Sequence, residues 1–258
     1  MNQTQSSGNE EDLNAAVSKV DLINRAIELS SVSFNYGSGP TMVEALKGVS
    51  ISIDRGEFVS IMGPSGSGKS TLVHVAAGLV APASGEVRVS GKLVRPNDRR
   101  TWALLRRHSI GVVFQRLNLI PTLSALENVM VPLILDGMNQ HQAAPLAKDA
   151  LEKVEFKHQS DRLPSELSGG EQQRVAIARA VVATRSLVLA DEPTGALDTT
   201  TSDQVMRLLR NLSASGTAVV MVTHDSRFAS WSDRVLSLRD GQLEASPPDK
   251  TTPETTSQ

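Results

Sequence analysis

FVSIMGPSGSGKST (residues 58–71) is the stretch that decides the fold of this chain. It opens with a continuous apolar run, FVSIM, which is typical of a central strand in a parallel sheet. The pattern G-x-x-x-x-G-K-[ST] follows (63–70), and STLVHVAAGLV (70–80) then has helical spacing. A strand, a glycine-rich loop and a helix in this order predict a phosphate-binding loop. The alternative is a glycine-rich turn with a solvated lysine, which the flanking strand and helix disfavour.

The residues of this loop have the chemistry that nucleotide phosphates require. Gly63, Gly66 and Gly68 allow backbone N–H groups to converge on phosphate oxygens without Cβ clashes. The start of the following helix adds the end of the helix dipole that favours anions. Lys69 offers a positive charge to the β- and γ-phosphates, and the hydroxyl of Ser70 is a ligand for Mg²⁺. The loop therefore predicts a site for nucleotide phosphates and Mg²⁺.

A second apolar run, LVLADEP (187–193), contains two adjacent carboxylates at its end. Asp191 can hold Mg²⁺ through a water molecule, while Glu192 orients or deprotonates the attacking water. By itself, an Asp-Glu pair after a strand is usually a solvated turn. The phosphate loop upstream favours the catalytic interpretation.

Three further residues are candidates for the same site, and each has an alternative that stays open. Gln115 closes the run GVVFQ and is either a strand-end amide or a site residue. His224 follows the apolar run VMVT, where a lone histidine is more often a structural hydrogen-bonding residue than a catalytic one. Tyr36, the single tyrosine, is either a surface aromatic or a stacking surface for a purine base.

LSGGEQQRVAIARA (167–180) begins a predicted helix with a feature that helix capping does not explain. Ser168 and Glu171 form the capping box S-x-x-E, and an apolar helical face follows. Gly169 and Gly170 cost helix stability in the first turn unless something approaches the backbone closely. The segment has the features of a phosphate site at a helix N-terminus, yet no lysine follows to hold the phosphate.

Composition and charge limit the classes of protein to consider. The 258 residues include 26 Lys and Arg against 28 Asp and Glu, which gives a formal net charge of −2. Proteins that bind nucleic acids usually carry a basic surplus, so no nucleic-acid partner is expected. The sequence has no cysteine, which excludes disulfides, thiolate zinc sites and cysteine nucleophiles.

No stretch of the sequence predicts a membrane span or a secretory signal. The N-terminus lacks the basic and apolar regions of a signal peptide. The longest apolar runs, such as VMVPLIL (129–135), are far shorter than the roughly 18–20 residues that cross a bilayer. We expect a soluble, cytoplasmic protein, so that work at a membrane requires another subunit that supplies the spans.

The chain is predicted to form one ordered domain between two tails. Residues 1–24 are rich in Asn, Gln, Ser and acidic residues, and residues 246–258 are rich in Pro and Thr, so both are expected to be disordered. Strand-like and helix-like segments alternate over residues 25–245. The part between about 116 and 166 has mainly helical patterns, which predicts a helical insertion between two α/β segments.

This alternation predicts an α/β fold whose mostly parallel sheet is covered on both faces. Apolar and polar residues alternate along VSISID (49–54), which predicts a half-buried strand, and DRG (54–56) is interpreted as a hairpin turn. In the helical insertion, Leu146, Ala150 and Val154 are expected to share one apolar stripe.

Taken together, these residues resemble the ATP-binding subunits of ABC transporters over about residues 26–244. In that family's terms, the motifs are the stacking aromatic Tyr36, Walker A at 63–71, the Q-loop residue Gln115, the signature LSGGEQQ, Walker B LVLADE, the D-loop GALD (195–198) and the switch histidine His224. So many motifs in the right order leave little room for chance, and the signature is the most specific of them.

The resemblance implies an α/β P-loop NTPase with a mostly parallel sheet core, an antiparallel β subdomain and a helical insertion, which is an ABC nucleotide-binding domain. It implies ATP hydrolysis, with ATP and Mg²⁺ bound. Glu192 and His224 are the implied catalytic residues, and Ser70, Gln115 and Asp191 the implied metal ligands. The implied nucleotide-binding residues are Tyr36, Gly63, Pro64, Ser65, Gly66, Ser67, Gly68, Lys69, Ser70, Thr71, Gln115, Ser168, Gly169, Gly170, Glu171 and Asp198.

The resemblance also implies partners. Two copies, or this chain and a related ATPase, pack head to tail, and the signature of one closes over the nucleotide held by the other's Walker A loop. Ser168 and the amides of Gly169 and Gly170 then contact the γ-phosphate in trans. An integral membrane permease supplies the spans, chooses the substrate, docks near Gln115 and keeps the ATPase at the cytoplasmic face of the cell membrane.

Within the family, RRHSIGVVFQRLNLIPTLSALENV (106–129) and LADEPTGALD (189–198) look most like the macrolide-exporter and lipoprotein-release branch. That branch typically reads TGNLD, and here Ala196 replaces the asparagine. We expect a motor for export or lipoprotein release. Three other roles stay open: an ATPase in a transmembrane signalling complex that regulates cell-wall enzymes, a nutrient importer ATPase, and an ABC ATPase that moves no substrate.

Overall fold

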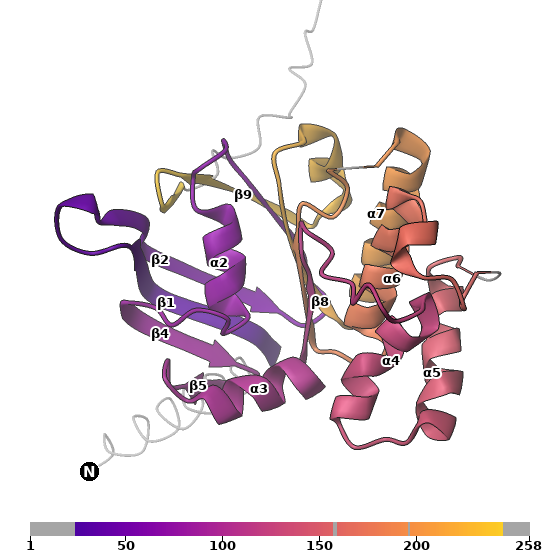
Figure 1. The fold of residues 1–258 in the computed structure, drawn as a ribbon. Coiled ribbons are helices and arrows are strands. Elements are labelled where there is room, and N and C mark those ends of the chain that lie inside the picture. The colour runs from indigo at the N-terminus through magenta and orange to yellow at the C-terminus, as the bar shows by residue number, and fades with distance from the viewer. Residues whose placement is uncertain (1–23, 157–158, 196, 245–258) are drawn as a thin grey trace, which may run out of the picture.

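The computed structural model describes residues 24–156, 159–195 and 197–244. Within them, the chain forms two sheets and a set of helices (Figure 1). The tails predicted at 1–24 and 246–258 lie outside the described residues except for Asn24, as does Ala196 of the D-loop. The boundaries of the single predicted domain therefore stay a prediction.

One sheet is antiparallel and has four strands in the order β2-β1-β4-β5. Its strands are β1 (Arg25–Tyr36), β2 (Val43–Asp54), β4 (Ser84–Val89) and β5 (Lys92–Val94), and a 3-10 turn, η1 (Gly39–Thr41), joins the first two. Along the end of β2, Val49, Ile51 and Ile53 are buried while Ser50 and Asp54 are exposed, so the predicted alternation is confirmed.

The other sheet has six strands in the order β10-β9-β3-β8-β7-β6. Its strands are β3 (Phe58–Met62), β6 (Ile110–Val113), β7 (Leu187–Asp191), β8 (Ala218–Thr223), β9 (Arg234–Arg239) and β10 (Gln242–Glu244). All neighbouring strands are parallel except β9 and β10. Every residue of β7 and β8 is buried, which is why these strands read as continuous apolar runs. The predicted mostly parallel sheet with an antiparallel subdomain is confirmed.

The hairpin predicted at DRG (54–56) is wrong. β2 ends at Asp54 and β3 begins at Phe58, but the two strands belong to different sheets. β3 pairs in parallel with β8 and β9 instead, because its apolar side chains need cover on both faces. The turn carries the chain from one sheet to the other. Gly56 adopts φ +76° there, a backbone conformation that glycine tolerates best.

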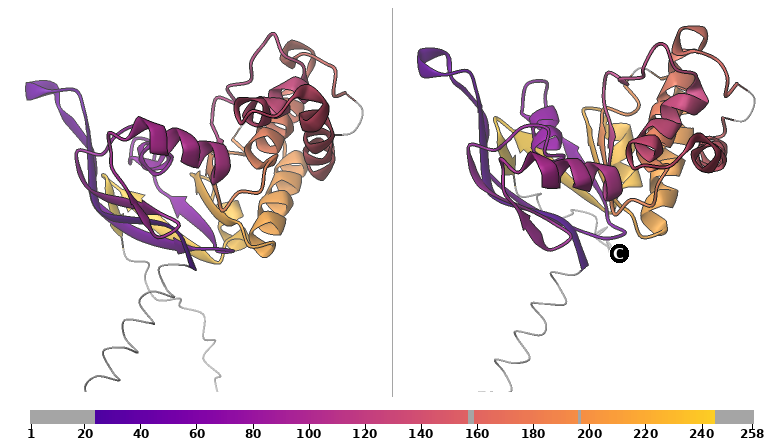
Figure 2. Two further views of the ribbon diagram at one scale, coloured as in Figure 1. Left: turned by 90° about the horizontal axis from the view of Figure 1, so that it is seen from below. Right: turned by 60° about the horizontal axis from the view of Figure 1, so that its bottom comes forward.

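Helices cover the sheets in two groups. They are α2 (Lys69–Ala76), α3 (Arg99–His108), α4 (Ala125–Leu135), α5 (Gln140–Lys153), α6 (Gly169–Val181) and α7 (Thr199–Ala214), with short 3-10 turns η2 (Pro164–Glu166) and η3 (Ser226–Trp231). Helix α2 lies between the two sheets, where Leu72 and Val73 pack among residues of both. Helices α4 to α7 lie on the opposite side of the parallel sheet, as both views in Figure 2 show.

The segment 116–166 contains α4, α5 and η2, and its described residues include no strand. The stripe predicted for α5 is wrong at one position, because Leu146 is 43% exposed while Ala150 and Val154 are buried. The buried face instead consists of small residues, including Ala143 and Ala147. Alanines allow α5 to pack closely against α4 and α6, and Leu146 is left at the outside.

A fully buried asparagine fixes the loop that leads into α4. The side-chain amide of Asn128 donates hydrogen bonds to the carbonyl oxygens of Ile120 (3.1 Å), Leu123 (2.9 Å) and Ser124 (3.0 Å). Its carbonyl oxygen accepts from the backbone N–H of Ile120 at 2.7 Å. The polar atoms of this buried side chain are therefore all paired, as buried polar groups require, and they hold several backbone groups of the loop.

Replacement of Asn128 by Ala is expected to lower the free energy of unfolding by about 3 kcal/mol, because several backbone groups of the loop lose their partners at once. Thermal or denaturant unfolding measures this change. Asn211→Ala, an exposed position on α7, is the matched control and should change stability by less than about 0.5 kcal/mol. Equal effects of the two substitutions would contradict the role of Asn128.

Candidate nucleotide site

The phosphate loop joins β3 to α2, and two of its glycines are required by close packing. A Cβ on Gly63 would lie 2.1 Å from the carbonyl oxygen of Leu238, and a Cβ on Gly68 would lie 2.4 Å from that of Ala45. Gly68 is also the N-cap of α2, with φ +103°. Gly66 has φ +80° and open space around it. The loop backbone is thus held in a shape that other residues could not adopt.

Lys69 directs its ammonium group into the loop. Its Nζ atom donates hydrogen bonds to the carbonyl oxygens of Gly63 and Pro64, each at 2.8 Å. The residue is only 8% exposed, so its charge is concentrated where the loop and the start of α2 converge. This combination of a lysine and a helix N-terminus is suited to phosphate oxygens.

Oxygen donors suitable for Mg²⁺ lie beside the loop. The hydroxyl of Ser70 donates a hydrogen bond to Oδ1 of Asp191 at 3.1 Å, which brings the loop and the end of β7 together. Burial raises the pKa of the Asp191 carboxyl, and the hydrogen bond from Ser70 acts in the opposite direction. Gln115 lines the pocket beside the phosphate loop, together with Ser70. Hydroxyl, carboxylate and amide oxygens are the ligands that Mg²⁺ takes in proteins, so the donor set fits this ion.

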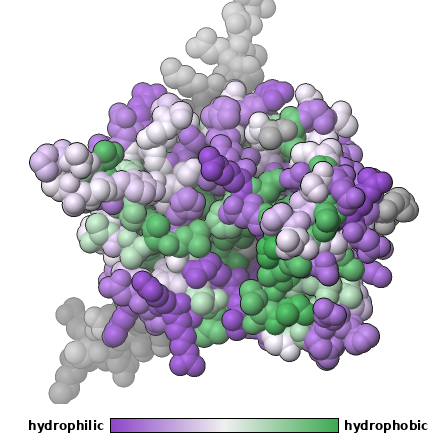
Figure 3. All heavy atoms as spheres, in the orientation of Figure 1, coloured by the Kyte–Doolittle hydropathy of each residue, from purple (hydrophilic) through white to green (hydrophobic). Residues whose placement is uncertain are grey.

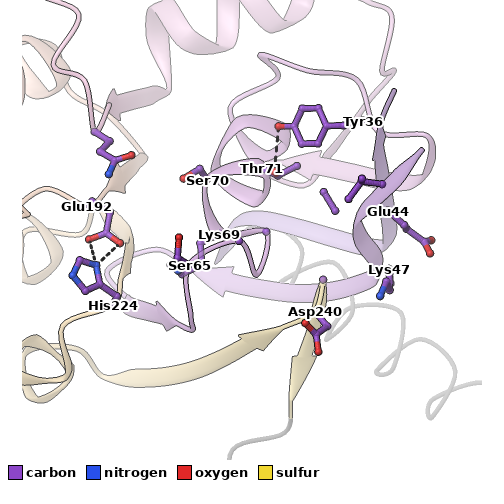
Figure 4. A pocket seen from close by; sticks show the side chains of 16 residues that line it. Tyr36, Glu44, Lys47, Ser65, Lys69, Ser70, Thr71, Glu192, His224 and Asp240 are labelled. Atoms are coloured by element: carbon purple, nitrogen blue, oxygen red, sulfur yellow. Dashed lines mark hydrogen bonds and ion pairs between the residues drawn. The ribbon is translucent and has the colours of Figure 1, made fainter. Parts of the chain in front are cut away.

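Glu192 and His224 form a pair at the edge of the pocket (Figure 4). The Nδ1 atom of His224 lies 2.9 Å from each carboxylate oxygen of Glu192. The side chain of Glu192 is 10% exposed and that of His224 is 66% exposed. Glu192 adopts φ +49°, which is uncommon for residues other than glycine and concentrates at functional sites. This backbone turns the carboxylate out of the sheet and toward the histidine.

These elements surround an open pocket of about 870 Å³. Most of the predicted site residues line it, namely Tyr36, Ser65, Gly66, Gly68, Lys69, Ser70, Thr71, Gln115, Glu192 and His224. The predicted residues Gly63, Pro64 and Ser67 belong to the same loop but do not line the pocket, and Asp191 reaches it through Ser70.

Sequence reasoning missed one wall of the pocket, formed by Val43, Glu44, Ala45, Lys47, Asp240 and Gly241. Val43 is 62% exposed and pairs with Tyr36 across β1 and β2. The hydroxyl of Tyr36 lies 3.2 Å from Oγ1 of Thr71, so the tyrosine ring stands beside the phosphate loop. An exposed valine is a weak signal in a sequence, and only the strand pairing places it next to Tyr36.

The signature segment lies apart from this pocket. Ser168, Gly170, Glu171 and Asp198 line a second hollow of about 430 Å³, which shares no residue with the first. The predicted capping box is present: Ser168 N donates to Oε2 of Glu171 at 2.8 Å, and Glu171 N donates to Oγ of Ser168 at 3.4 Å. The hydrogen bonds from Ser168 lower the pKa of Glu171.

Asp198 and Gly170 both lie beside Thr201 of α7, a proximity that the sequence did not indicate. Asp198 is the N-cap of α7, and hydrogen bonds from Thr201 lower the pKa of its carboxyl. A Cβ on Gly170 would lie 3.1 Å from Cγ2 of Thr201. A Cβ on Gly169 would meet no described atom within 4 Å.

A phosphate loop on a mostly parallel sheet, with a carboxylate and a histidine facing it, defines a P-loop nucleotide hydrolase. The family model described as ABC transporter matches residues 46–195, more than half of the chain. The chain therefore belongs to the ABC transporter ATP-binding family, and it is an ATPase.

Curated relatives come from the predicted branch. The lipoprotein-releasing system ATP-binding protein LolD of Geobacter metallireducens is 45% identical over 220 residues, which cover 85% of this chain and 98% of LolD. The macrolide export ATP-binding/permease protein MacB of Hyphomonas neptunium is 44% identical over 217 residues. That match covers 84% of this chain but 34% of MacB, so the chain spans about a third of this relative.

Solved structures of ATP-binding cassettes have the same fold. A dimeric ABC transporter cassette is 43% identical, with a TM-score of 0.81, and the match covers 85% of this chain and 97% of that one. A related structure at 42% identity, also with a TM-score of 0.81, is a dimeric post-hydrolysis state bound to ADP and Pi. The predicted ABC nucleotide-binding fold is thus confirmed.

Proposed function

We propose that this chain is the motor subunit of a transporter for export or lipoprotein release. In this proposal it pairs head to tail with a second copy around two ATP molecules. The pair drives a separate membrane permease. One observation carries the pairing. The phosphate loop and the signature segment line separate hollows on the same chain, so one chain does not place both segments around the same nucleotide. A second copy completes both hollows.

The glycines of the signature segment support contact in trans. Gly169 is in the first turn of α6, where glycine costs helix stability, and no described atom of this chain would contact a Cβ at that position. Packing within one chain therefore gives no reason for this glycine. Close approach of a γ-phosphate held by another chain gives one, since the N-terminus of α6 favours an anion.

In the proposed reaction, the residues of two facing chains surround each γ-phosphate. Glu192 accepts a proton from the attacking water as the water oxygen bonds to the γ-phosphorus and the bond to the β-phosphate bridging oxygen breaks. His224, which contacts both carboxylate oxygens of Glu192, holds the carboxylate and the water in place. Loss of the γ-phosphate removes the group that joins the two chains, so the dimer opens.

Mg²⁺ fits this proposal through Ser70, Asp191 and Gln115. The ion would neutralise charge on the β- and γ-phosphate oxygens when it is bound. Ser70 and Asp191 are already joined by a hydrogen bond, which fixes two oxygen donors at one edge of the phosphate loop.

A groove beside Gln115 is suited to a permease segment. It has a volume of about 310 Å³, and its lining combines apolar residues, including Leu79, Ile110 and Phe114, with three arginines, Arg106, Arg179 and Arg185. Arg179 of α6 donates hydrogen bonds to the carbonyl oxygens of Leu117 and Asn118, each at 2.6 Å. The signature helix is therefore bound directly to the segment after Gln115, which gives a physical connection between the nucleotide and the groove.

The membrane spans in this proposal belong to the permease. Within the described residues, no helix is both long and apolar enough to cross a membrane. The LolD relative is likewise described as the ATP-binding protein of a releasing system, whereas the MacB relative is an ATP-binding/permease protein.

Isolation of the native complex from detergent-solubilised membranes tests the proposed partner. We expect the chain to co-purify with an integral membrane subunit, and we expect that subunit to stimulate or restrain ATP hydrolysis. Recovery of the chain only with ribosomes or DNA would contradict the transporter role while leaving the ATPase assignment in place.

Removal of the Tyr36 ring is expected to weaken ATP binding. Tyr36→Ala should raise the Kd for ATP by about 5- to 10-fold, because the base loses a stacking surface. Tyr36→Phe is the matched control: it keeps the ring, removes the hydroxyl that faces Thr71, and should change the Kd by less than about twofold. A fluorescent ATP analogue measures both. If Ala and Phe bind equally well, the ring does not contact the base.

A further inference from the structure

Positive charge is concentrated in one short segment of a chain that is otherwise slightly acidic. Residues 88–108 contain seven of the 26 Lys and Arg of the sequence and only one acidic residue, Asp98. They form the end of β4, the edge strand β5 and helix α3, and five of the seven cations follow β5. The nucleotide site described above uses none of these residues.

The two faces of α3 differ in what they contact. Trp102 is 3% exposed and packs into the core, and Arg106 donates hydrogen bonds to the carbonyl oxygens of Ala77 and Gly78 after α2. Arg100, Leu104 and Arg107 follow one another at helical spacing on the opposite face. Leu104 is 43% exposed. The outward face therefore alternates arginine, leucine and arginine.

The outward arginines have no assigned partner in the fold. Within residues 24–156, 159–195 and 197–244, the guanidinium groups of Arg100 and Arg107 make no hydrogen bond or ion pair. Arg106, on the inward face, does make such bonds. Packing explains the inward Arg106 but not the outward Arg100 and Arg107.

Exposed aliphatic residues lie next to this basic face. Ile134 and Leu135, at the end of α4, are 39% and 64% exposed. Nε2 of His108 lies 3.4 Å from Oδ1 of Asp136, so the ends of α3 and α4 are side by side. In Figure 1 both helix ends lie at the bottom of the molecule, and in Figure 3 hydrophilic side chains protrude at the lower left beside a hydrophobic area over α4.

From these observations we propose that the outward face of α3, together with the exposed end of α4, binds the surface of a membrane that contains anionic phospholipids. Here this surface, called the basic face, consists of Arg100, Leu104, Arg107 and Leu135. A basic amphipathic helix with aliphatic residues between its cations is typical of helices that lie at lipid headgroups. Each cation near an anionic bilayer adds to the attraction.

The chemistry favours lipid over an acidic protein segment. Arg100, Leu104 and Arg107 lie on the outward face of α3, and this helix crosses the front of the molecule in the view from below (Figure 2, left). A flat layer of mobile phosphate headgroups can meet such a face without a shaped groove, and the aliphatic side chains can enter the boundary between headgroups and acyl chains. This binding requires neither a permease nor ATP hydrolysis, so it goes beyond the function proposed above.

Co-sedimentation with lipid vesicles tests the basic face. The full chain should sediment with vesicles of phosphatidylcholine and phosphatidylglycerol, should not sediment with phosphatidylcholine alone, and should be released by salt. Arg100→Glu/Arg107→Glu should lower binding at least about tenfold, since it reverses two charges at the surface. Lys148→Glu/Arg207→Glu, on α5 and α7, makes the same change in net charge elsewhere and should retain most of the binding.

A measurement of the ATP hydrolysis rate in solution distinguishes a failure of this proposal from a failure of the proposed function. The α3 variant should hydrolyse ATP at the unmodified rate, and if the double reversal fails to fold, Arg100→Gln/Arg107→Gln replaces it. The proposal is overturned if the mixed vesicles are not bound, or if both double variants bind them equally. Binding to an acidic peptide without binding to mixed vesicles would assign the face to a protein partner and would also overturn it.

Discussion

Glu192→Gln is expected to lower ATP turnover by about 10²- to 10⁴-fold, the range for loss of a general base, while ATP binding is retained. The amide keeps the shape of the carboxylate but cannot accept the proton from the attacking water. Because hydrolysis is what opens the proposed dimer, the variant should also accumulate as an ATP-dependent dimer. Phosphate release measures turnover, and light scattering during size-exclusion chromatography measures the dimer.

The pocket offers a matched control for this substitution. Glu44 also lines the pocket, but it lies on β2, on the far side of the phosphate loop from His224, as Figure 4 shows. Glu44→Gln removes the same charge and should change turnover by less than about threefold. If Glu192→Gln hydrolyses ATP at the normal rate, or if both variants lose activity equally, Glu192 is not the base.

The sequence predicts those parts of the site that are continuous in the chain. The phosphate loop follows from local pattern alone, because a strand, three glycines and a helix determine both its backbone and its chemistry. The Ser168–Glu171 capping box is similarly local and has the expected geometry. Glu192 and His224 were each recognisable as polar residues at the ends of apolar strands, and parallel strands end at the same edge of a sheet.

What the sequence does not predict depends on pairing between distant segments. β2 and β3 are separated by a short turn yet join different sheets, because β3 needs burial on both faces and β2 on one. The pocket wall around Val43 and Asp240 comes from β2 and from the turn after β9, which no local pattern connects. Helical spacing places Leu146 on the predicted apolar stripe, but it is exposed, because alanines provide the closer helix contact.

The second large effect is expected at the signature segment. Ser168→Arg should abolish the ATP-dependent dimer and lower turnover at least about tenfold, while a single chain still binds ATP. The reason is geometric: Ser168 lines a hollow that is separate from the nucleotide pocket of its own chain, so a bulky cation there obstructs only a facing copy. Dimer formation is best measured in chains that also carry Glu192→Gln, where hydrolysis cannot separate the pair.

The structure provides an unusually close control, because Ser124 caps α4 with the same capping box that Ser168 forms at α6. Ser124→Arg and Ser168→Arg should each lose about 1 kcal/mol of stability, the usual cost of a lost N-cap. Only Ser168→Arg should prevent the dimer. If the two variants dimerise equally well with ATP, the signature does not act in trans. If both fail to bind ATP as single chains, the loss comes from folding rather than from the interface.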